Sequence, residues 1–371
     1  MTDFAKYANP GVLGLHPYQP GKPIEELERE YGVSNIVKLA SNENPLGPSP
    51  RAQAAMRGEL EGVWLYPDGN GFELKQKLAA KHGVTISQIT LGNGSSDVLE
   101  FAVRVFVRPG DEVLFSEHSF ALYPILTQAV GGKAVAAPAK EWGHDLEAIK
   151  ASISEHTRVI FIANPNNPTG TWLGAGELES FIQTVPEHTL VVVDEAYFDY
   201  AIDPATGAKN YPDTTAWVSR YPNLMVARTF SKSYGLAGLR VGYAISHPQV
   251  ADLMNRVRPP FNVNSVALAA AAEALDDVEH LERSVKMNAE GLRQLVAGFT
   301  SQGLDYVPSV GNFISVDVGR PAGPVYEALL REGVIVRPVA NYGMPNHLRV
   351  TVGTKEENER FLTALQKVLA G

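Results

Sequence analysis

Lys232 stands in a loop where a lysine amine could act as a nucleophile. The loop follows the apolar segment Leu224–Ala227 and runs through small residues to Arg240. A lysine buried there would lose its hydration, which lowers its pKa and makes the neutral amine reactive toward an aldehyde. The alternative is a solvated surface lysine, as most lysines are. The Arg240 guanidinium can bind a phosphate through paired hydrogen bonds, or can form a surface ion pair.

Two other segments place polar groups beside apolar or helical ones. Asp194 follows the apolar run Thr189–Val193. A buried carboxylate needs a partner, which could be a protonated ring nitrogen, although an aspartate in this position is also a common helix cap. Gly94, Ser95 and Ser96 precede a helical pattern. Their N–H groups and hydroxyls can hold a phosphate at a helix N-terminus, and the alternative is again an ordinary cap.

The elements that must position these groups alternate between strands and helices. Short β-branched runs predict buried strands, and apolar residues at helical spacing predict helices between them. The predicted strands are Asp111–Phe115, Arg158–Ala163, Thr189–Val193 and Leu224–Ala227, and the predicted helices are Ser96–Phe106 and Ala175–Thr184. This alternation favours a mostly parallel sheet that is covered on both faces. Ligands collect beyond the carboxyl ends of such strands, where the polar segments converge.

The two ends of the chain differ from this middle part. The stretch up to about Pro50 is rich in Pro and Gly, and it predicts an extended arm. After Pro260 the sequence predicts helices at Val266–Leu275, Asp277–Phe299 and Glu356–Leu369, with strands at Asn312–Val318 and His347–Val352. We therefore expect an arm with part of a small domain at 1–47, a large domain at 48–262 and a small α+β domain at 263–371.

Composition restricts the chemistry and the partners. The chain has 371 residues, 44% hydrophobic and 20% charged, with a net charge of −9. The negative charge is spread along the chain, which argues against nucleic acid or an anionic membrane as a partner. There are no cysteines, so disulfides, thiolate metal sites and a cysteine nucleophile are excluded. We expect no metal, signal peptide or membrane span, and a cytoplasmic location.

Taken together, the motifs resemble a known family. Asn167-Pro168-Thr169-Gly170, Asp194-Glu195-Ala196-Tyr197 and the segment from Ser231 to Arg240 occur in the order found in the fold-type I aminotransferases, which use pyridoxal 5′-phosphate (PLP). Among these, the chain is most similar to the histidinol-phosphate aminotransferases, from about His16 to Thr354. The resemblance implies a large domain with a mostly parallel seven-stranded sheet between helices, and a smaller α+β domain.

The resemblance also implies an activity and a pathway. The expected reaction is reversible amino transfer between L-histidinol phosphate and 2-oxoglutarate in histidine biosynthesis, giving imidazole acetol phosphate and glutamate. The alternatives are an aminotransferase for phenylalanine and tyrosine, a PLP decarboxylase of the O-phosphothreonine type, and a non-catalytic PLP-binding regulatory module. An imidazole pocket differs from a phenyl pocket by only a few contacts, so the sequence leaves the first two open.

Residue roles follow from the same resemblance. Lys232 would bind the cofactor covalently and shuttle the substrate proton, and Asp194 would pair with the pyridine nitrogen. Asn167 and Tyr197 would donate to the ring oxygen, and Phe120 would stack on the ring. The phosphate would be held by Gly94, Ser95, Ser96, Ser231 and Arg240, with Thr229 as a weaker candidate.

Substrate and subunit contacts complete the implied site. Arg349 would clamp the α-carboxylate with help from Asn312, and Arg337 would lie near the side-chain end of the substrate. Tyr18 and the segment Ser41–Pro45, with Asn42, would close over the ligand. Tyr66 would reach the cofactor phosphate of a neighbouring subunit, which implies a homodimer with shared sites.

Overall fold

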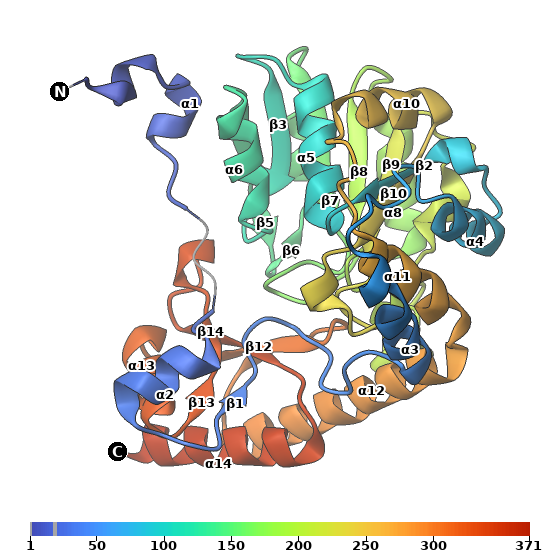
Figure 1. The fold of residues 1–371 in the computed structure, drawn as a ribbon. Helices are drawn as coiled ribbons and strands as arrows, with labels where there is room; N and C mark the ends of the chain where they lie inside the picture. The colour runs from blue at the N-terminus through green and yellow to red at the C-terminus, as the bar shows by residue number, and fades with distance from the viewer. Residues whose placement is uncertain (1, 18–20) are drawn as a thin grey trace.

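A computed structural model describes residues 2–17 and 21–371 of the chain. Figure 1 shows a large sheet with helices on both faces, and below it a smaller sheet beside the long helices α12 and α14. The first part of the N-terminal arm, with α1 (Pro10–Leu13), lies beside α6 (Leu122–Ala129), and α2 (Ile24–Tyr31) lies beside the smaller sheet. Asn9 fixes the first part of the arm to the end of α6, because its side-chain amide donates to the Ala129 carbonyl at 3.1 Å.

The described residues form a seven-stranded sheet in the order β2-β10-β9-β8-β7-β3-β4. Its strands are β2 (Ile89–Gly92), β3 (Glu112–Ser116), β4 (Lys133–Ala137), β7 (Thr157–Ala163), β8 (Leu190–Asp194), β9 (Leu224–Thr229) and β10 (Gly242–Ser246). Only β10 runs antiparallel to its neighbours within this described sheet. Its central strands are buried along their whole length, as expected for a sheet that is covered on both faces.

Helices cover the two faces of the large sheet with separate apolar cores. One face packs against α5 (Ser95–Phe106), α6 (Leu122–Ala129) and α10 (Pro248–Val257). The other packs against α3 (Pro50–Glu59), α4 (Phe72–His82), α7 (Leu146–Ala151), α8 (Ala175–Thr184) and α11 (Ser265–Asp276). A short helix, α9 (Phe198–Ala201), and the hairpin β5 (Ala139–Lys140) with β6 (Gly143–His144) lie among the loops.

The smaller part of the molecule combines both ends of the chain. Its sheet has the order β11 (Tyr306–Val307), β12 (Phe313–Asp317), β15 (His347–Thr351) and β14 (Arg337–Pro338), all antiparallel. Strand β1 (Val37–Lys38) pairs in parallel with β13 (Val334–Ile335). The helices α12 (Val278–Ser301), α13 (Ala322–Arg331) and α14 (Lys355–Ala370) bury their apolar faces against these strands.

These elements confirm the predicted fold class and all of the predicted strands and helices, with ends that differ by a few residues. The prediction of an extended arm is wrong in part, because the arm contains α1 (Pro10–Leu13) and α2 (Ile24–Tyr31). In α2 the buried Leu27 packs against Leu330 and Ile335, and Gly32, with φ +66°, ends the helix. The helix was not predicted because the Pro and Gly content of this stretch favoured an extended chain.

The expected domain bounds stay a prediction. Helix α11 belongs to the core of the large sheet, so we propose that the second boundary lies near the start of α12. Within the described residues, no helix is long and apolar enough to cross a membrane, and no cluster of side chains could bind a metal ion. The cytoplasmic location also stays a prediction.

Candidate active site

The predicted chemical groups meet at one edge of the large sheet. Strands β2, β8 and β9 end there, and antiparallel β10 begins there, since Gly242 pairs with both Thr229 and Gly92. This register brings Arg240 to the same edge as Asp194. A cavity of about 200 Å³ lies at this edge. The predicted residues that line it are Asn42, Ser95, Ser96, Phe120, Asn167, Asp194, Tyr197, Thr229, Ser231, Lys232, Arg240, Arg337 and Arg349.

One corner of the cavity has the chemistry of a phosphate site. Ser95 and Ser96 form the first turn of α5, where backbone N–H groups and the helix dipole favour an anion. The Arg240 guanidinium lies beside them and contacts the Ser231 hydroxyl at 3.3 Å. Gly94, with φ +86°, allows this approach, because a Cβ there would lie 2.4 Å from Arg240 Nη2.

Asp194 is a buried carboxylate, and only one of its two oxygens has a hydrogen-bond partner among the described residues. Tyr123 donates its hydroxyl to Oδ2 at 2.9 Å. Among the described residues, no donor makes a hydrogen bond to the buried Oδ1, although the nearby Ala196 amide lowers the pKa of the carboxyl. Burial outweighs these effects and raises the pKa of Asp194 to about 6. An orphaned acceptor of this kind fits the protonated ring nitrogen of PLP.

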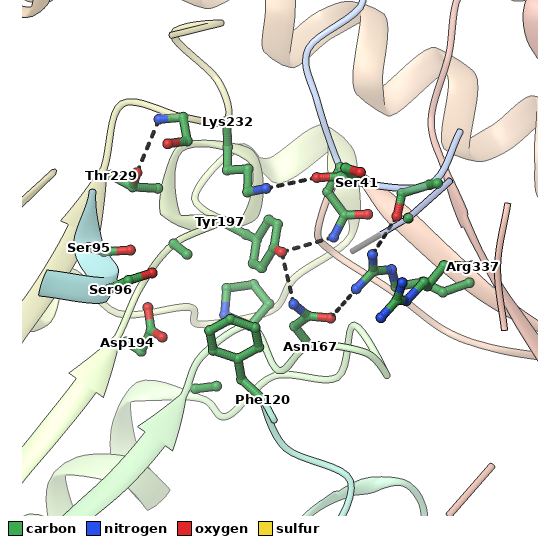
Figure 2. A pocket seen from close by; sticks show the side chains of 18 of the residues that line it. Ser41, Ser95, Ser96, Phe120, Asn167, Asp194, Tyr197, Thr229, Lys232 and Arg337 are labelled. Carbon is green, nitrogen blue, oxygen red and sulfur yellow. Dashed lines mark hydrogen bonds between the residues drawn. The ribbon is translucent and has the colours of Figure 1, made fainter. Parts of the chain in front are cut away.

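Lys232, which is half-buried, presents its amine to the same cavity (Figure 2). Its Nζ donates to the backbone carbonyl of Ser41 at 3.0 Å. Burial, assisted by the nearby positive charge of Arg349, lowers the pKa of Lys232 to about 7. Much of the amine is therefore neutral near pH 7, which is the form that attacks an aldehyde.

A chain of hydrogen bonds connects the remaining polar groups (Figure 2). The Tyr197 hydroxyl accepts from Asn42 Nδ2 at 2.9 Å and from Asn167 Nδ2 at 3.2 Å. Arg349 Nη1 in turn donates to Asn167 Oδ1 at 2.6 Å, and its Nη2 donates to the Ala40 carbonyl at 2.7 Å. The guanidinium expected to bind substrate is thus held in place by the arm and by a neighbour of Tyr197.

A second cavity of about 750 Å³ adjoins the first, because Gly21 and Arg337 line both. The arm, α6, α13 and β14 form its walls. This space lies at the Arg337 end of the site, where the side chain of a substrate was expected.

Of the predicted site residues that the structure describes, three do not line the first cavity. Gly94 lies behind Arg240, and Asn312 donates to the Asn42 carbonyl at 2.9 Å. Tyr66 is 82% exposed and stacks on Phe261, with ring centroids 4.6 Å apart, so it does not serve the site of its own chain. Tyr18 lies outside the described residues.

Two residues at the site were missed from the sequence. In the sequence, Tyr123 is one residue of an apolar stretch, and nothing there indicates its bond to Asp194. Thr351 donates to Asn42 Oδ1 at 3.1 Å and accepts from the Asn42 backbone N–H at 2.9 Å. The segment Leu348–Thr354 that carries the resemblance includes Thr351, so its place in the motif could have suggested it.

Comparisons with known proteins identify the family of the chain. A model of the family "Aminotransferase class I and II" matches residues 34–365. The chain therefore belongs to the class I and II aminotransferases. It is 61% identical to "Histidinol-phosphate aminotransferase 1" of Nitrosococcus oceani, over 99% of this chain and 98% of the relative. It is 59% identical to "Histidinol-phosphate aminotransferase 2" of Pseudomonas aeruginosa, over the full length of both. Within the class, it is a member of the histidinol-phosphate aminotransferases.

A solved structure extends the likeness to the fold. The histidinol-phosphate aminotransferase from Sinorhizobium meliloti, solved in complex with pyridoxal-5′-phosphate, has a TM-score of 0.87 and 30% sequence identity to this chain. The match covers 97% of each chain. That relative was thus solved with the cofactor whose ring nitrogen, phosphate and aldehyde the present site fits.

Proposed function

We propose that the protein is a PLP-dependent aminotransferase whose cofactor lies in the cavity between Lys232 and Asp194. The observation that carries the proposal is that the Lys232 amine, with its lowered pKa, and a buried, unsatisfied carboxylate oxygen of Asp194 border one cavity. The phosphate corner beside Arg240 supports the same placement. Phe120 borders the cavity where it can stack on a ring.

Each side chain then has a definite task. When bound, PLP supplies an aldehyde that takes up the amino group and a ring that withdraws electrons from the reacting carbon. Lys232 would hold the cofactor through its aldehyde carbon, and as a free amine it would accept and return the proton of substrate Cα. Asp194 would hold the protonated ring nitrogen at Oδ1. Asn167 and Tyr197 direct polar groups at the ring oxygen, and the buried walls exclude water.

We propose that the substrates are L-histidinol phosphate and 2-oxoglutarate, which give imidazole acetol phosphate and glutamate. The relatives that match this chain over its whole length carry the name of this activity. The second cavity offers room for an imidazole ring. Arg337 and Arg349 offer guanidinium groups, which suit both the phosphate of one substrate and the carboxylates of the other.

A substrate panel on the holoprotein tests this function. L-histidinol phosphate, phenylalanine and tyrosine are each supplied with 2-oxoglutarate, and glutamate is measured. We expect the highest kcat/KM with L-histidinol phosphate. A higher value with phenylalanine or tyrosine would replace the proposed substrate by an aromatic amino acid. Release of carbon dioxide without glutamate would indicate a decarboxylase, and no half-reaction with any donor would indicate a non-catalytic PLP protein.

We further propose that the protein acts as a homodimer whose subunits share their active sites. An exposed apolar surface, here called the 60–72 surface, is formed by Leu60, Val63, Trp64, Leu65, Tyr66 and Phe72, with Phe261 beside Tyr66. Trp64 and Tyr66 are 80% and 82% exposed, which is unusual for large aromatic side chains outside an interface. A second copy covering this surface would bring Tyr66 toward a neighbouring cavity.

Mixed dimers test the shared site. Tyr66→Ala and Lys232→Ala variants are each expected to be inactive or strongly impaired. When they are unfolded and refolded together, a mixed dimer contains one site with Lys232 from one subunit and Tyr66 from the other. We expect activity to return in the mixture, toward a quarter of the wild-type value for random pairing. A mixture no more active than its components would contradict the shared site.

A further inference from the structure

Tyr123 contacts two of the groups proposed to hold the cofactor, although it does not line the cavity. It lies on α6, its side chain is fully buried, and its ring stacks on Phe161 with a centroid distance of 4.4 Å and an interplanar angle of 4°. Its hydroxyl donates to Asp194 Oδ2 at 2.9 Å. The edge of its ring meets Phe120, with centroids 5.8 Å apart at 88°.

The hydrogen bond determines which oxygen of Asp194 is available. Burial raises the pKa of Tyr123 well above its ordinary value, so the hydroxyl stays protonated and can only donate to a carboxylate. Oδ2 is therefore occupied, and Oδ1 is the oxygen left without a hydrogen-bond partner among the described residues. A carboxylate held at one oxygen cannot rotate freely, so Oδ1 has a fixed direction.

The ring contact has a second effect. Phe120 has no polar group that could fix its plane, and it borders the cavity that Asp194 also borders. The rigid stack of Tyr123 on Phe161 supplies a wall at right angles to Phe120. One side chain therefore touches both the carboxylate and the ring that would contact the cofactor.

We propose that Tyr123 is a positioning residue: its hydroxyl holds Asp194 Oδ2 so that Oδ1 faces the cofactor ring nitrogen, and its ring fixes the plane of Phe120. This inference rests on the proposed function, because it assumes that PLP binds between Phe120 and Asp194. Tyr123 itself touches neither cofactor nor substrate, and it acts through its two neighbours.

The test uses Tyr123→Phe, which removes the hydroxyl and keeps the ring. We expect faster loss of PLP from the holoprotein and a slower half-reaction with L-histidinol phosphate, each by about tenfold to a hundredfold, as for the loss of a buried hydrogen bond to a charged group. Tyr243→Phe is the matched control. Tyr243 is also buried and bonds to His82 at 3.0 Å, but it belongs to the core on the other face of the sheet. We expect this control to resemble wild type.

A modified cofactor separates positioning from a general loss of structure. A PLP analogue with a methylated ring nitrogen is permanently cationic, so its charge does not depend on Asp194. With this analogue the half-reaction rates of wild type and Tyr123→Phe should agree within about twofold. A deficit that persists with the analogue, or that Tyr243→Phe shares, would overturn the inference, as would a variant equal to wild type with PLP. If wild type itself shows no visible absorbance with PLP, the proposed function fails instead.

Discussion

Burial pushes the pKa values of two residues in opposite directions at this site. It lowers the pKa of Lys232 to about 7 and raises that of Asp194 to about 6, because each loses hydration in its charged form. The amine thereby becomes a nucleophile near neutral pH. A protonated ring nitrogen beside Oδ1 would lower the pKa of the carboxyl again, since an opposite charge stabilises the ionised form. The site therefore favours binding of a ring whose protonated nitrogen lies beside Asp194.

The first prediction concerns Lys232→Ala. Removal of the amine should abolish the visible absorbance of protein-bound cofactor and lower turnover with L-histidinol phosphate by at least about a thousandfold, because both the covalent attachment and the proton transfer are lost. Absorbance after gel filtration with PLP and a glutamate assay measure the two effects. Lys81→Ala serves as a control, since Lys81 bonds to Tyr234 away from the cavity. Normal turnover in Lys232→Ala would refute the mechanism.

A second prediction follows from the pKa of Lys232. The neutral amine reacts with the aldehyde, so the rate at which apoprotein captures PLP should rise as pH increases through about 7 and then level off. For an ordinary lysine, with a pKa of 10.5, the rate would continue to rise far above neutrality. Stopped-flow absorbance from pH 5.5 to 9.5 gives the profile. A rate still rising at the upper end would show that burial does not activate this amine.

A third prediction tests carboxylate recognition. Arg349→Lys keeps the positive charge but loses the fork that can hold a carboxylate while also donating to Asn167 and Ala40. We expect KM for glutamate and 2-oxoglutarate to rise about tenfold or more, with the visible absorbance of bound cofactor retained. Steady-state kinetics with each substrate measure this. An unchanged KM for both acids would assign the carboxylate to another residue, such as Arg337, which also lines the cavity.

At the scale of elements, the junction between β2 and α5 has to accommodate Arg240. Gly94→Ala places a Cβ against the guanidinium at a left-handed φ, so we expect a loss of about 1–3 kcal/mol in unfolding free energy and about tenfold weaker PLP binding. Thermal unfolding and fluorescence titration measure the two quantities. Gly238→Ala, in the same loop as Arg240, is the control, because an added Cβ there meets nothing within 4 Å. Equal effects of both substitutions would contradict the role of Gly94.

The elements of the large sheet could be predicted because their apolar runs are continuous and end in polar segments. The strand before Asp194 is an example, since Leu190–Val193 is wholly buried. The helix α2 could not be predicted as readily, because it is stabilised by packing against Leu330 and Ile335, which lie about 300 residues away in the sequence. Tyr123 was missed for a similar reason, since only the packed sheet brings α6 against the end of β8.

The roles expected from family motifs were easier to locate than the contacts that support them. The family motifs pointed to Lys232, Asp194 and Arg349, and all three line the cavity. Asn42 was expected to bind substrate, yet its amide is already bonded to Tyr197 and Thr351. Such bonds depend on pairing across the molecule, which local patterns do not contain. The assignment of Asn42 to the substrate therefore stays a prediction, with a supporting role for Tyr197 beside it.

At the scale of the whole molecule, the 60–72 surface should control association. Trp64→Asp places a charge on this surface, so we expect the dimer to dissociate at least about tenfold more readily, because a buried unpaired charge in an interface is costly. Sedimentation velocity over a range of concentrations measures the change. Ile202→Asp, at an exposed apolar residue away from that surface, is the control and should sediment as wild type. A monomeric wild type would contradict the proposal that Tyr66 contributes to the active site of a neighbouring subunit.

The pairing of β1 with β13 also affects how the protein matures. Ala40, whose carbonyl receives Arg349, lies 309 positions before that arginine. While the chain is being synthesised, the large sheet can assemble first, but the arm has nothing to pair with until the last strands emerge. A nascent chain that has not yet exposed β13 and β15 therefore lacks the contact between Ala40 and Arg349, and we expect it to retain the cofactor only after these strands have emerged.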